Sequence, residues 1–143
     1  MSATLRIVDV INTAASAKEI LLDRARQFHR PPAVENWIVC SAGDHVDQIR
    51  RAGLPVDVID TPRGLDPAAL AQAIWRLVRF FRRCKPDLVH THSSVPGVVG
   101  RLAARAAGVP IVVHTVHGFH FHRGSRLPSR SRAYSHRRRQ LPQ

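Results

Sequence analysis

The sequence of 143 residues lacks the features that mark several common classes of protein. It has no apolar run of about 18 residues, the length that a helix needs to cross a bilayer. Its first segment, MSATLRIVDVINT, carries one early arginine but no long apolar region with a cleavage site, so export is not predicted. We therefore expect a cytoplasmic protein.

Cysteine and glycine signatures are also missing. Cys40 and Cys84 are the only cysteines, and their separation does not match the short spacings of metal sites. Without an export signal, two reduced structural thiols are the expectation. The first predicted strand is followed by the residues NTAAS rather than by G-x-G-x-x-G, which argues against a nicotinamide-dependent dehydrogenase.

Acidic residues are absent from the last part of the chain. The formal net charge is +12, but residues 1–122 hold 15 basic and 10 acidic residues, whereas residues 123–143 hold seven arginines and no acid. The first 122 residues are therefore only mildly basic. The high isoelectric point rests mostly on the final segment and does not by itself indicate a nucleic-acid partner.

Apolar runs alternate with amphipathic segments through residues 1–122. Strands are predicted at residues 5–11, 37–40, 56–59, 88–89 and 111–113, and helices lie between them. Arg6 and Asp9 interrupt the first apolar run. The alternation predicts a Rossmann-like, doubly wound and mostly parallel α/β sheet, with a strand order such as 3-2-1-4-5.

The predicted helices have recognisable ends and faces. Residues 16–19 fit a capping box, Asp66-Pro67 is a helix start, and Gly53 and Gly108 each end a helix just before a proline and a strand. The apolar faces are predicted to comprise, helix by helix, Ile20, Leu21, Ala25 and Phe28; Leu70, Ile74, Leu77, Val78 and Phe81; and Val98, Val99, Leu102, Ala103 and Ala106.

The helix at residues 67–83 also carries a basic face. Its cations are Arg76, Arg79, Arg82, Arg83 and, just beyond, Lys85. A solvated face is the plain interpretation. The alternative adds Trp75 and Phe80 and predicts peripheral contact with an anionic membrane at its inner face.

Six of the nine histidines follow the last two predicted strands. They are His90, His92, His114, His117, His120 and His122. Ligands of open α/β sheets bind beyond the carboxyl ends of the strands. We therefore expect residues 91–94 and 115–118, the two polar tips, to lie side by side and to form half of a ligand groove.

The same region carries a family resemblance. The segments PDLVHTHSS (86–94), GVVGRLAAR (97–105) and GVPIVVHTVHGF (108–119) resemble the N-terminal domain of family-four glycosyltransferases, which are retaining enzymes of the GT-B architecture. The resemblance covers roughly residues 5–122. It implies that residues 1–122 form a single, acceptor-side domain of an enzyme that transfers a sugar from a nucleotide-sugar donor to a polysaccharide or lipid-linked acceptor, with no tightly bound cofactor. It further implies a separate C-terminal donor domain or partner subunit, and hence a chain that is inactive alone.

The resemblance also implies site residues. His117 matches the family histidine after the fifth strand, which would lie beside the transferred sugar as the catalytic residue. A neutral imidazole there would donate a hydrogen bond to a sugar hydroxyl, and a charged one would stabilise the leaving phosphate. The acceptor or substrate would be bound by Thr13, His92, Ser93, Ser94, Thr115 and Gly118. In the first turn Thr13-Ala14-Ala15 replaces the family's glycine pair, which argues against close approach of a phosphate there.

Other chemistry at these residues is less well supported by the sequence. His90 and His92 lie two apart on a strand and share a face, but zinc requires three or four convergent ligands, so no metal site is predicted. Ser93 and Ser94 lack the G-x-S-x-G elbow of a nucleophile, and an N-cap role explains a serine at this position. For His117 the alternative is an ordinary surface histidine.

Residues 123–143 have no apolar periodicity. They are predicted to be a basic disordered or out-of-frame tail. Two further functions stay open beside the glycosyltransferase: a stand-alone sugar- or phosphate-binding module, and a nucleic-acid-binding protein that uses the basic tail, which is the less favoured of the two. An incomplete sheet also predicts exposed edges and an unburied interdomain face.

Overall fold

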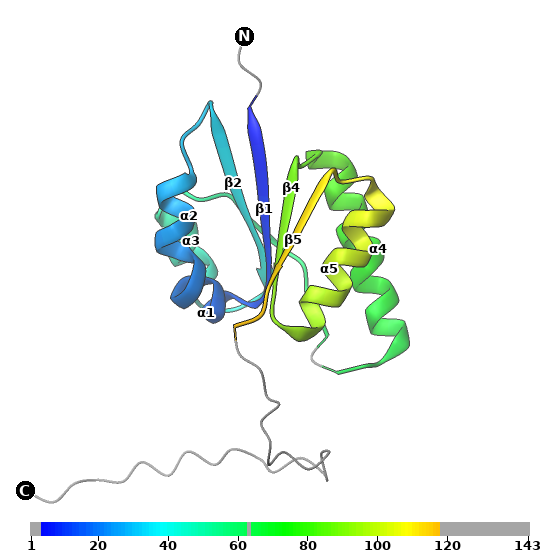
Figure 1. The fold of residues 1–143 in the computed structure, drawn as a ribbon. Helices are drawn as coiled ribbons and strands as arrows, with labels where there is room; N and C mark the ends of the chain where they lie inside the picture. Colours follow the sequence, from blue (N-terminus) through cyan, green and yellow to red (C-terminus); the bar gives the residue numbers. More distant parts are fainter. Residues whose placement is uncertain (1–3, 63, 118–143) are drawn as a thin grey trace, which may run out of the picture.

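Five parallel strands form the centre of the structure, a computed structural model that describes residues 4–62 and 64–117 (Figure 1). The strands are β1 (Leu5–Thr13), β2 (Val34–Ser41), β3 (Val56–Val58), β4 (Leu88–His92) and β5 (Ile111–Thr115). Their order in the sheet is β3-β2-β1-β4-β5, and every neighbouring pair is parallel. The predicted doubly wound sheet and its strand order are confirmed.

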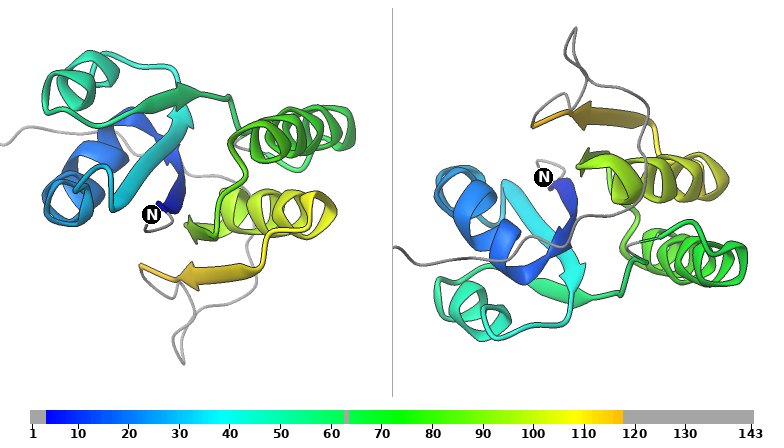
Figure 2. Two further views of the ribbon diagram at one scale, coloured as in Figure 1. Left: turned by 90° about the horizontal axis from the view of Figure 1, so that it is seen from above. Right: turned by 90° about the horizontal axis from the view of Figure 1, so that it is seen from below.

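Helices cover both faces of this sheet (Figures 1 and 2). One face carries α1 (Ala14–Ser16), η1 (Ala17–Leu21), α2 (Leu22–Phe28) and α3 (Val46–Arg51), and the other carries α4 (Pro67–Cys84) and α5 (Ser94–Ala107). Each set packs over its own apolar cluster. In the described residues, no helix combines the length and the apolar character needed to span a bilayer.

The first helical segment begins earlier than predicted. Thr13, not Ser16, is the N-cap, and its Oγ1 accepts a hydrogen bond from the Ser16 backbone N–H at 3.1 Å. The π-helical turn η1 follows and shifts the buried face, because a wider turn rotates the residues after it. Leu21 is buried as predicted, but Ile20 and Phe28 are exposed. The capping-box prediction was therefore wrong.

The helix α4 matches its prediction at both ends and along its buried face. Asp66 Oδ2 accepts a hydrogen bond from the Ala69 N–H at 2.9 Å, which caps the first turn. Leu77 and Phe81 are buried. Phe80 is buried as well, so it cannot belong to the lipid-facing surface that the alternative interpretation gave it.

The helix α5 is rotated relative to its predicted face. Val99 and Ala103 are buried, but Val98, Leu102 and Ala106 are exposed. The cause is the pair of glycines that faces the sheet: a Cβ on Gly100 would lie 2.7 Å from Thr91 Cγ2, and one on Gly97 would overlap the His114 ring. The helix therefore rests on the sheet through its glycines.

Several smaller predictions also have an outcome. Gly53 and Gly108 adopt φ of 84° and 77°, the left-handed conformation expected at a helix end. Both cysteines are free, and burial raises the pKa of each thiol to about 11, as expected of reduced structural thiols. Arg6 at the start of β1 is paired with Glu35 at 2.8 Å.

The strand β5 forms one edge of the sheet and is poorly covered. Its Ile111, Val112 and Val113 side chains are 51%, 38% and 41% exposed. The exposed edge predicted from the sequence is thus present among the described residues. The predicted tail at 123–143, together with Gly118, His120 and His122, lies outside them.

Candidate functional site

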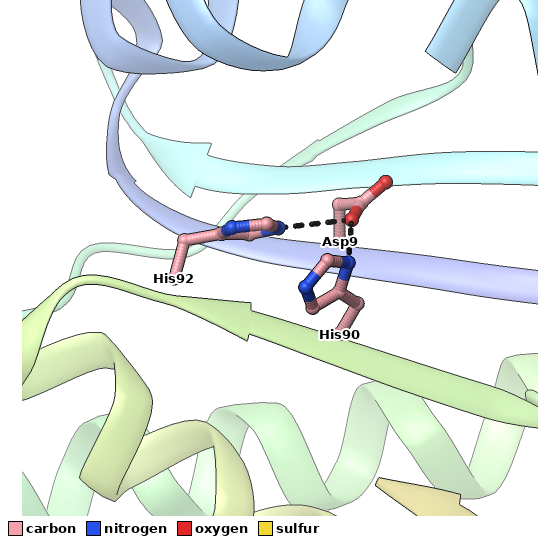
Figure 3. Close-up of side chains that lie close together, drawn as sticks. All are labelled: Asp9, His90 and His92. Carbon is pink, nitrogen blue, oxygen red and sulfur yellow. Dashed lines mark hydrogen bonds and ion pairs between the residues drawn. The ribbon is translucent and has the colours of Figure 1, made fainter. Parts of the chain in front are cut away.

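A buried carboxylate, Asp9 in the middle of β1, forms the centre of the polar part of the structure. Its side chain is 0% exposed. Oδ1 lies 3.0 Å from His92 Nε2 and 3.3 Å from His90 Nδ1 (Figure 3). It also contacts the Arg24 guanidinium. Oδ2 accepts a hydrogen bond from Asn36 Nδ2 at 3.0 Å. The carboxylate thus joins four side chains from β2, β4 and α2.

The strand period explains why these groups meet. Val8 and Val10 point toward α4 and α5, so Asp9 between them points to the opposite face, where α2 lies. Asp9 pairs with His90 in the register of β1 and β4. His92 is two residues further along and therefore points to the same face, as the sequence predicted.

The environment keeps Asp9 ionised. Burial alone would raise its pKa, but hydrogen bonds from His90 and His92, the nearby Arg24 charge and the Asn36 amide lower the pKa well below its usual range. A buried charge of this kind is tolerated only where it is paired and hydrogen-bonded. Asp9 is therefore a permanent acceptor of hydrogen bonds.

His92 is held in the neutral form. It is 1% exposed, and burial lowers its pKa by more than the hydrogen bond to Asp9 raises it; the nearby His90 lowers it further. Because an ionised carboxylate only accepts, the proton of neutral His92 must be on Nε2, which faces Asp9. Its Nδ1 is then left as an acceptor.

The structure brings the two predicted polar tips together. His92 Nδ1 at the end of β4 lies 2.9 Å from His117 Nε2, just after β5. His90 Nε2 lies 2.7 Å from Thr115 Oγ1, a second link between the tips. His117 is exposed while His92 beneath it is buried, so His117 is the histidine of this pair that a ligand can reach.

Within the described residues, the other predicted site residues do not link the two polar tips. Thr13 is occupied as the cap of α1. Ser94 is exposed. His114 points to the opposite face, where its Nδ1 lies 2.9 Å from Thr91 Oγ1. Gly118 is outside the described residues, and its predicted role is not addressed by them.

Ser93 stands where the sequence suggested an N-cap but does not act as one. It occupies the N-cap position of α5, but its side chain makes no capping hydrogen bond. Its backbone has φ 66° and ψ 173°, a conformation that is almost confined to glycine and costs about 1–3 kcal/mol. This strain lies at the end of β4, directly after His92.

The cluster also has the residue types of a metal site. The ligand atoms of Asp9, His90 and His92 lie within 4.8 Å of one another. However, the Arg24 guanidinium contacts Asp9 Oδ1 and lies 3.2 Å from His90 Nδ1, so one positive group already neutralises the carboxylate on that side. A divalent ion would be repelled by this guanidinium.

Sequence reasoning missed Asp9, Arg24 and Asn36 as parts of this site. In the sequence pattern Asp9 is an interruption of an apolar strand. The available signal was that a carboxylate in a strand covered on both faces must have partners. Which residues supply them depends on the rotation of α2 over the sheet, and the sequence pattern did not give that rotation.

Comparison with known proteins adds an independent observation. Residues 20–141 match the family model described as a glycosyl transferase 4-like domain. Among relatives, the UDP-Gal:alpha-D-GlcNAc-diphosphoundecaprenol alpha-1,3-galactosyltransferase of Escherichia coli is 62% identical over 45 residues, which are 32% of this chain and 12% of the relative.

Two further matches cover more of the chain. The UDP-N-acetylglucosamine–N-acetylmuramyl-(pentapeptide) pyrophosphoryl-undecaprenol N-acetylglucosamine transferase of Ectopseudomonas mendocina is 31% identical over 99 residues, 63% of this chain and 28% of the relative. The crystal structure of a glycosyltransferase from Rickettsia africae superposes with a TM-score of 0.69 and 15% identity, over 85% of this chain and 32% of that one. The chain therefore spans less than a third of each of these proteins.

Proposed function

Because the chain belongs to the glycosyl transferase 4-like domain family, we propose that it forms the acceptor side of a site that transfers a sugar from a nucleotide-sugar donor to a lipid-linked acceptor. The family that the sequence resemblance predicted is thereby confirmed. Both sequence relatives are named for a UDP-sugar donor and an undecaprenol-diphosphate acceptor, which supports these two substrate classes. The observation that carries the proposal is the exposed His117 ring, anchored by buried His92 where β4 and β5 end.

The proposed site combines an imidazole with several hydroxyl groups. His117 would contact the reacting sugar, and Thr13, Ser93, Ser94, Thr115 and Gly118 would line the acceptor side, with His92 beneath. Sugars present many hydroxyl groups, and a small number of well-placed polar side chains is the usual way in which a site orients such a ligand. The carboxyl ends of parallel strands are where such ligands bind.

We further propose that the donor-binding half is supplied by another domain or by a partner subunit. The lengths of the relatives support this, because each is several times longer than the segment that matches. On this proposal the 143-residue chain binds the acceptor but does not transfer sugar alone. Sugar transfer by the purified chain from UDP-galactose or UDP-N-acetylglucosamine would contradict it.

Acceptor binding is the direct test of the proposed function. The probe is a water-soluble, short-chain polyprenyl diphosphate that carries N-acetylglucosamine, titrated into the full chain and followed by NMR. We expect shifts at His117 and Thr115, and about tenfold weaker binding for His117→Ala, as for the loss of one or two hydrogen bonds of about 1 kcal/mol each. The matched control is His29→Ala at the other end of the sheet. Unchanged affinity in His117→Ala would overturn the proposal.

A lipid-linked acceptor lies in a membrane. The proposal therefore includes a contact between this chain and a membrane surface. The exposed face of α4 offers Arg76 and Arg79 around Trp75, which is 56% exposed, beside a hollow of about 320 Å³. The same hollow is lined by Arg83, which is paired with Asp57 at 3.1 Å. Arg79 lies over the Trp75 ring at 4.7 Å. We propose that this surface rests on anionic lipid at the cytoplasmic side of a membrane.

Vesicle binding tests this contact. Sedimentation with phosphatidylglycerol vesicles should fall by roughly tenfold or more in Arg76→Ser/Arg79→Ser, since each cation near an anionic surface contributes about 1 kcal/mol. The control pair is Arg50→Ser/Arg51→Ser on α3, which should bind as the wild type does. Equal losses in the two pairs would show only a general effect of charge and would contradict the assignment to α4.

A further inference from the structure

Three side chains form a continuous line from the interior of the sheet to its surface. Asp9 Oδ1 lies 3.0 Å from His92 Nε2, and His92 Nδ1 lies 2.9 Å from His117 Nε2. The centres of the two imidazole rings are 5.1 Å apart and the rings are tilted by only 24°. Since the nitrogens are much closer than the ring centres, the rings meet edge to edge, as an N–H···N hydrogen bond requires.

The direction of these hydrogen bonds follows from the buried end. Asp9 is ionised and can only accept, so Nε2 of neutral His92 carries the proton and Nδ1 does not. The neighbouring His117 nitrogen must then be the donor. A neutral imidazole has one N–H, so His117 has its proton on Nε2 and a lone pair on Nδ1.

We propose that Asp9 and His92 are positioning residues that fix His117 in the Nε2–H tautomer, so that its exposed ring presents Nδ1 as a hydrogen-bond acceptor for a hydroxyl of the bound sugar. The tautomer is a property of the chain alone, and its use toward a sugar rests on the proposed function. This proposal takes the place of the prediction that neutral His117 donates to the sugar, because on it the one N–H of His117 donates to His92 Nδ1, 2.9 Å away. Only a charged His117 could donate at Nδ1.

The groups around Asp9 support this direction of the hydrogen bonds, from His117 to His92 and from His92 to Asp9. Arg24 from α2 and Asn36 from β2 donate to the carboxylate. His90 on β4 stands beside His92, with 4.0 Å between ring centres, and its Nδ1 lies between Asp9 and Arg24. No acid other than Asp9 contacts the line in the described part of the chain. The carboxylate therefore alone sets the direction of the hydrogen bonds.

The tautomer can be measured by NMR in the full 143-residue chain with 15N-labelled histidine, from long-range 1H–15N correlations at about pH 8, where an imidazole is neutral. A free neutral imidazole populates both tautomers. In the wild type the hydrogen bond to His92 Nδ1 should leave only the Nε2–H form of His117, so we expect its Nδ1–H form to be absent. His29 supplies the internal reference, because its Nδ1 accepts from the Asn36 backbone N–H at 3.0 Å and fixes the same tautomer independently. A mixture at His117 beside a single tautomer at His29 would overturn the proposal.

One substitution separates the two hydrogen bonds of His92. In His92→Gln the amide can reach Asp9 in place of Nε2 but leaves no group beside His117, so the Nδ1–H form of His117 should return. The matched control is His90→Gln, which removes the other histidine on Asp9 but no contact with His117. An unchanged tautomer in His92→Gln would refute the positioning role, and if that variant does not fold the wild-type spectrum still decides. A fixed tautomer without acceptor binding would instead count against the proposed function.

Discussion

Alternate residues of β1 and β4 turn to opposite faces of the sheet, and around Asp9 the buried side chains on the two faces differ in chemistry. Val8, Val10 and Val89 turn toward α4 and α5 and are fully buried in an apolar cluster. Asp9 and His92 turn the other way and are equally buried, but in a hydrogen-bonded cluster. Burial is therefore the same for these two sets of side chains, and only the means of stabilisation differs.

The difference shows how one strand can serve two purposes. The apolar face stabilises the fold in proportion to the area that it removes from water, without a preferred direction. The polar face gains little net stability from its hydrogen bonds but fixes the direction of each one. We expect substitutions on the apolar face to change stability, and substitutions on the polar face to change the orientation and protonation of His117.

The largest effect should come from breaking the apolar face. Phe81→Ala removes a fully buried ring under β1 and β4 and should lower the free energy of unfolding by about 3–5 kcal/mol, measured by urea denaturation. Phe28→Ala is the matched control, because that ring is 53% exposed and its loss should cost about 0.5 kcal/mol or less. Equal losses in the two variants would contradict the burial of Phe81 in the apolar cluster.

A smaller loss of stability is expected from a substitution where α5 packs on β4. Gly100→Ala would place a Cβ 2.7 Å from Thr91 Cγ2, and overpacking costs about 1–3 kcal/mol. Alanine recovers up to about 1 kcal/mol of this through its helix propensity, so a net loss of about 1 kcal/mol is expected in urea unfolding. Gly43→Ala is the control, since its nearest contact would be an ordinary 3.5 Å. A more stable Gly100→Ala variant would show that α5 has room to move away.

The smallest predicted effect is the pH dependence that the polar face gives to the free energy of unfolding. Burial lowers the pKa of His92 below the usual imidazole value of about 6.5, so below that pH the unfolded chain takes up a proton that the folded chain resists. The free energy of unfolding should therefore fall as the pH decreases below 6.5. The lowered pKa of Asp9 acts in the same direction, but only below about 3.8.

Urea unfolding of the wild type and of His92→Gln at pH 8, 6 and 5 isolates the histidine. The wild type should lose more stability than the variant between pH 8 and 5, because glutamine does not titrate. Parallel curves for the two proteins would mean that His92 is not held neutral by burial.

The sequence supported the fold better than it supported the site. Strand order followed from the alternation of elements, and the approach of His92 to His117 followed from the rule that parallel strands end at one rim. The rotation of helices could not be obtained in this way. Leu102 became exposed because Gly97 and Gly100 let α5 lie flat on the sheet.

The partners of Asp9 were also beyond the sequence pattern. The sequence pattern placed Asp9 within a buried strand, as an interruption of its apolar run, but could not name the group opposite it. Arg24 lies on α2, directly after the π-helical turn η1, and its contact with Asp9 depends on the rotation of that helix. The strained backbone of Ser93 likewise had no signal, since serine is a normal N-cap residue.

The hydrogen bond between His92 and His117 is the contact on which the account depends most. It can be observed directly as a scalar coupling between His117 Nε2 and His92 Nδ1 across the shared proton, in the 15N-labelled chain at low temperature. We predict a resolved coupling that disappears in His92→Gln and persists in His90→Gln. Absence of the coupling in a wild-type spectrum that shows the His117 Nε2–H proton would contradict the account.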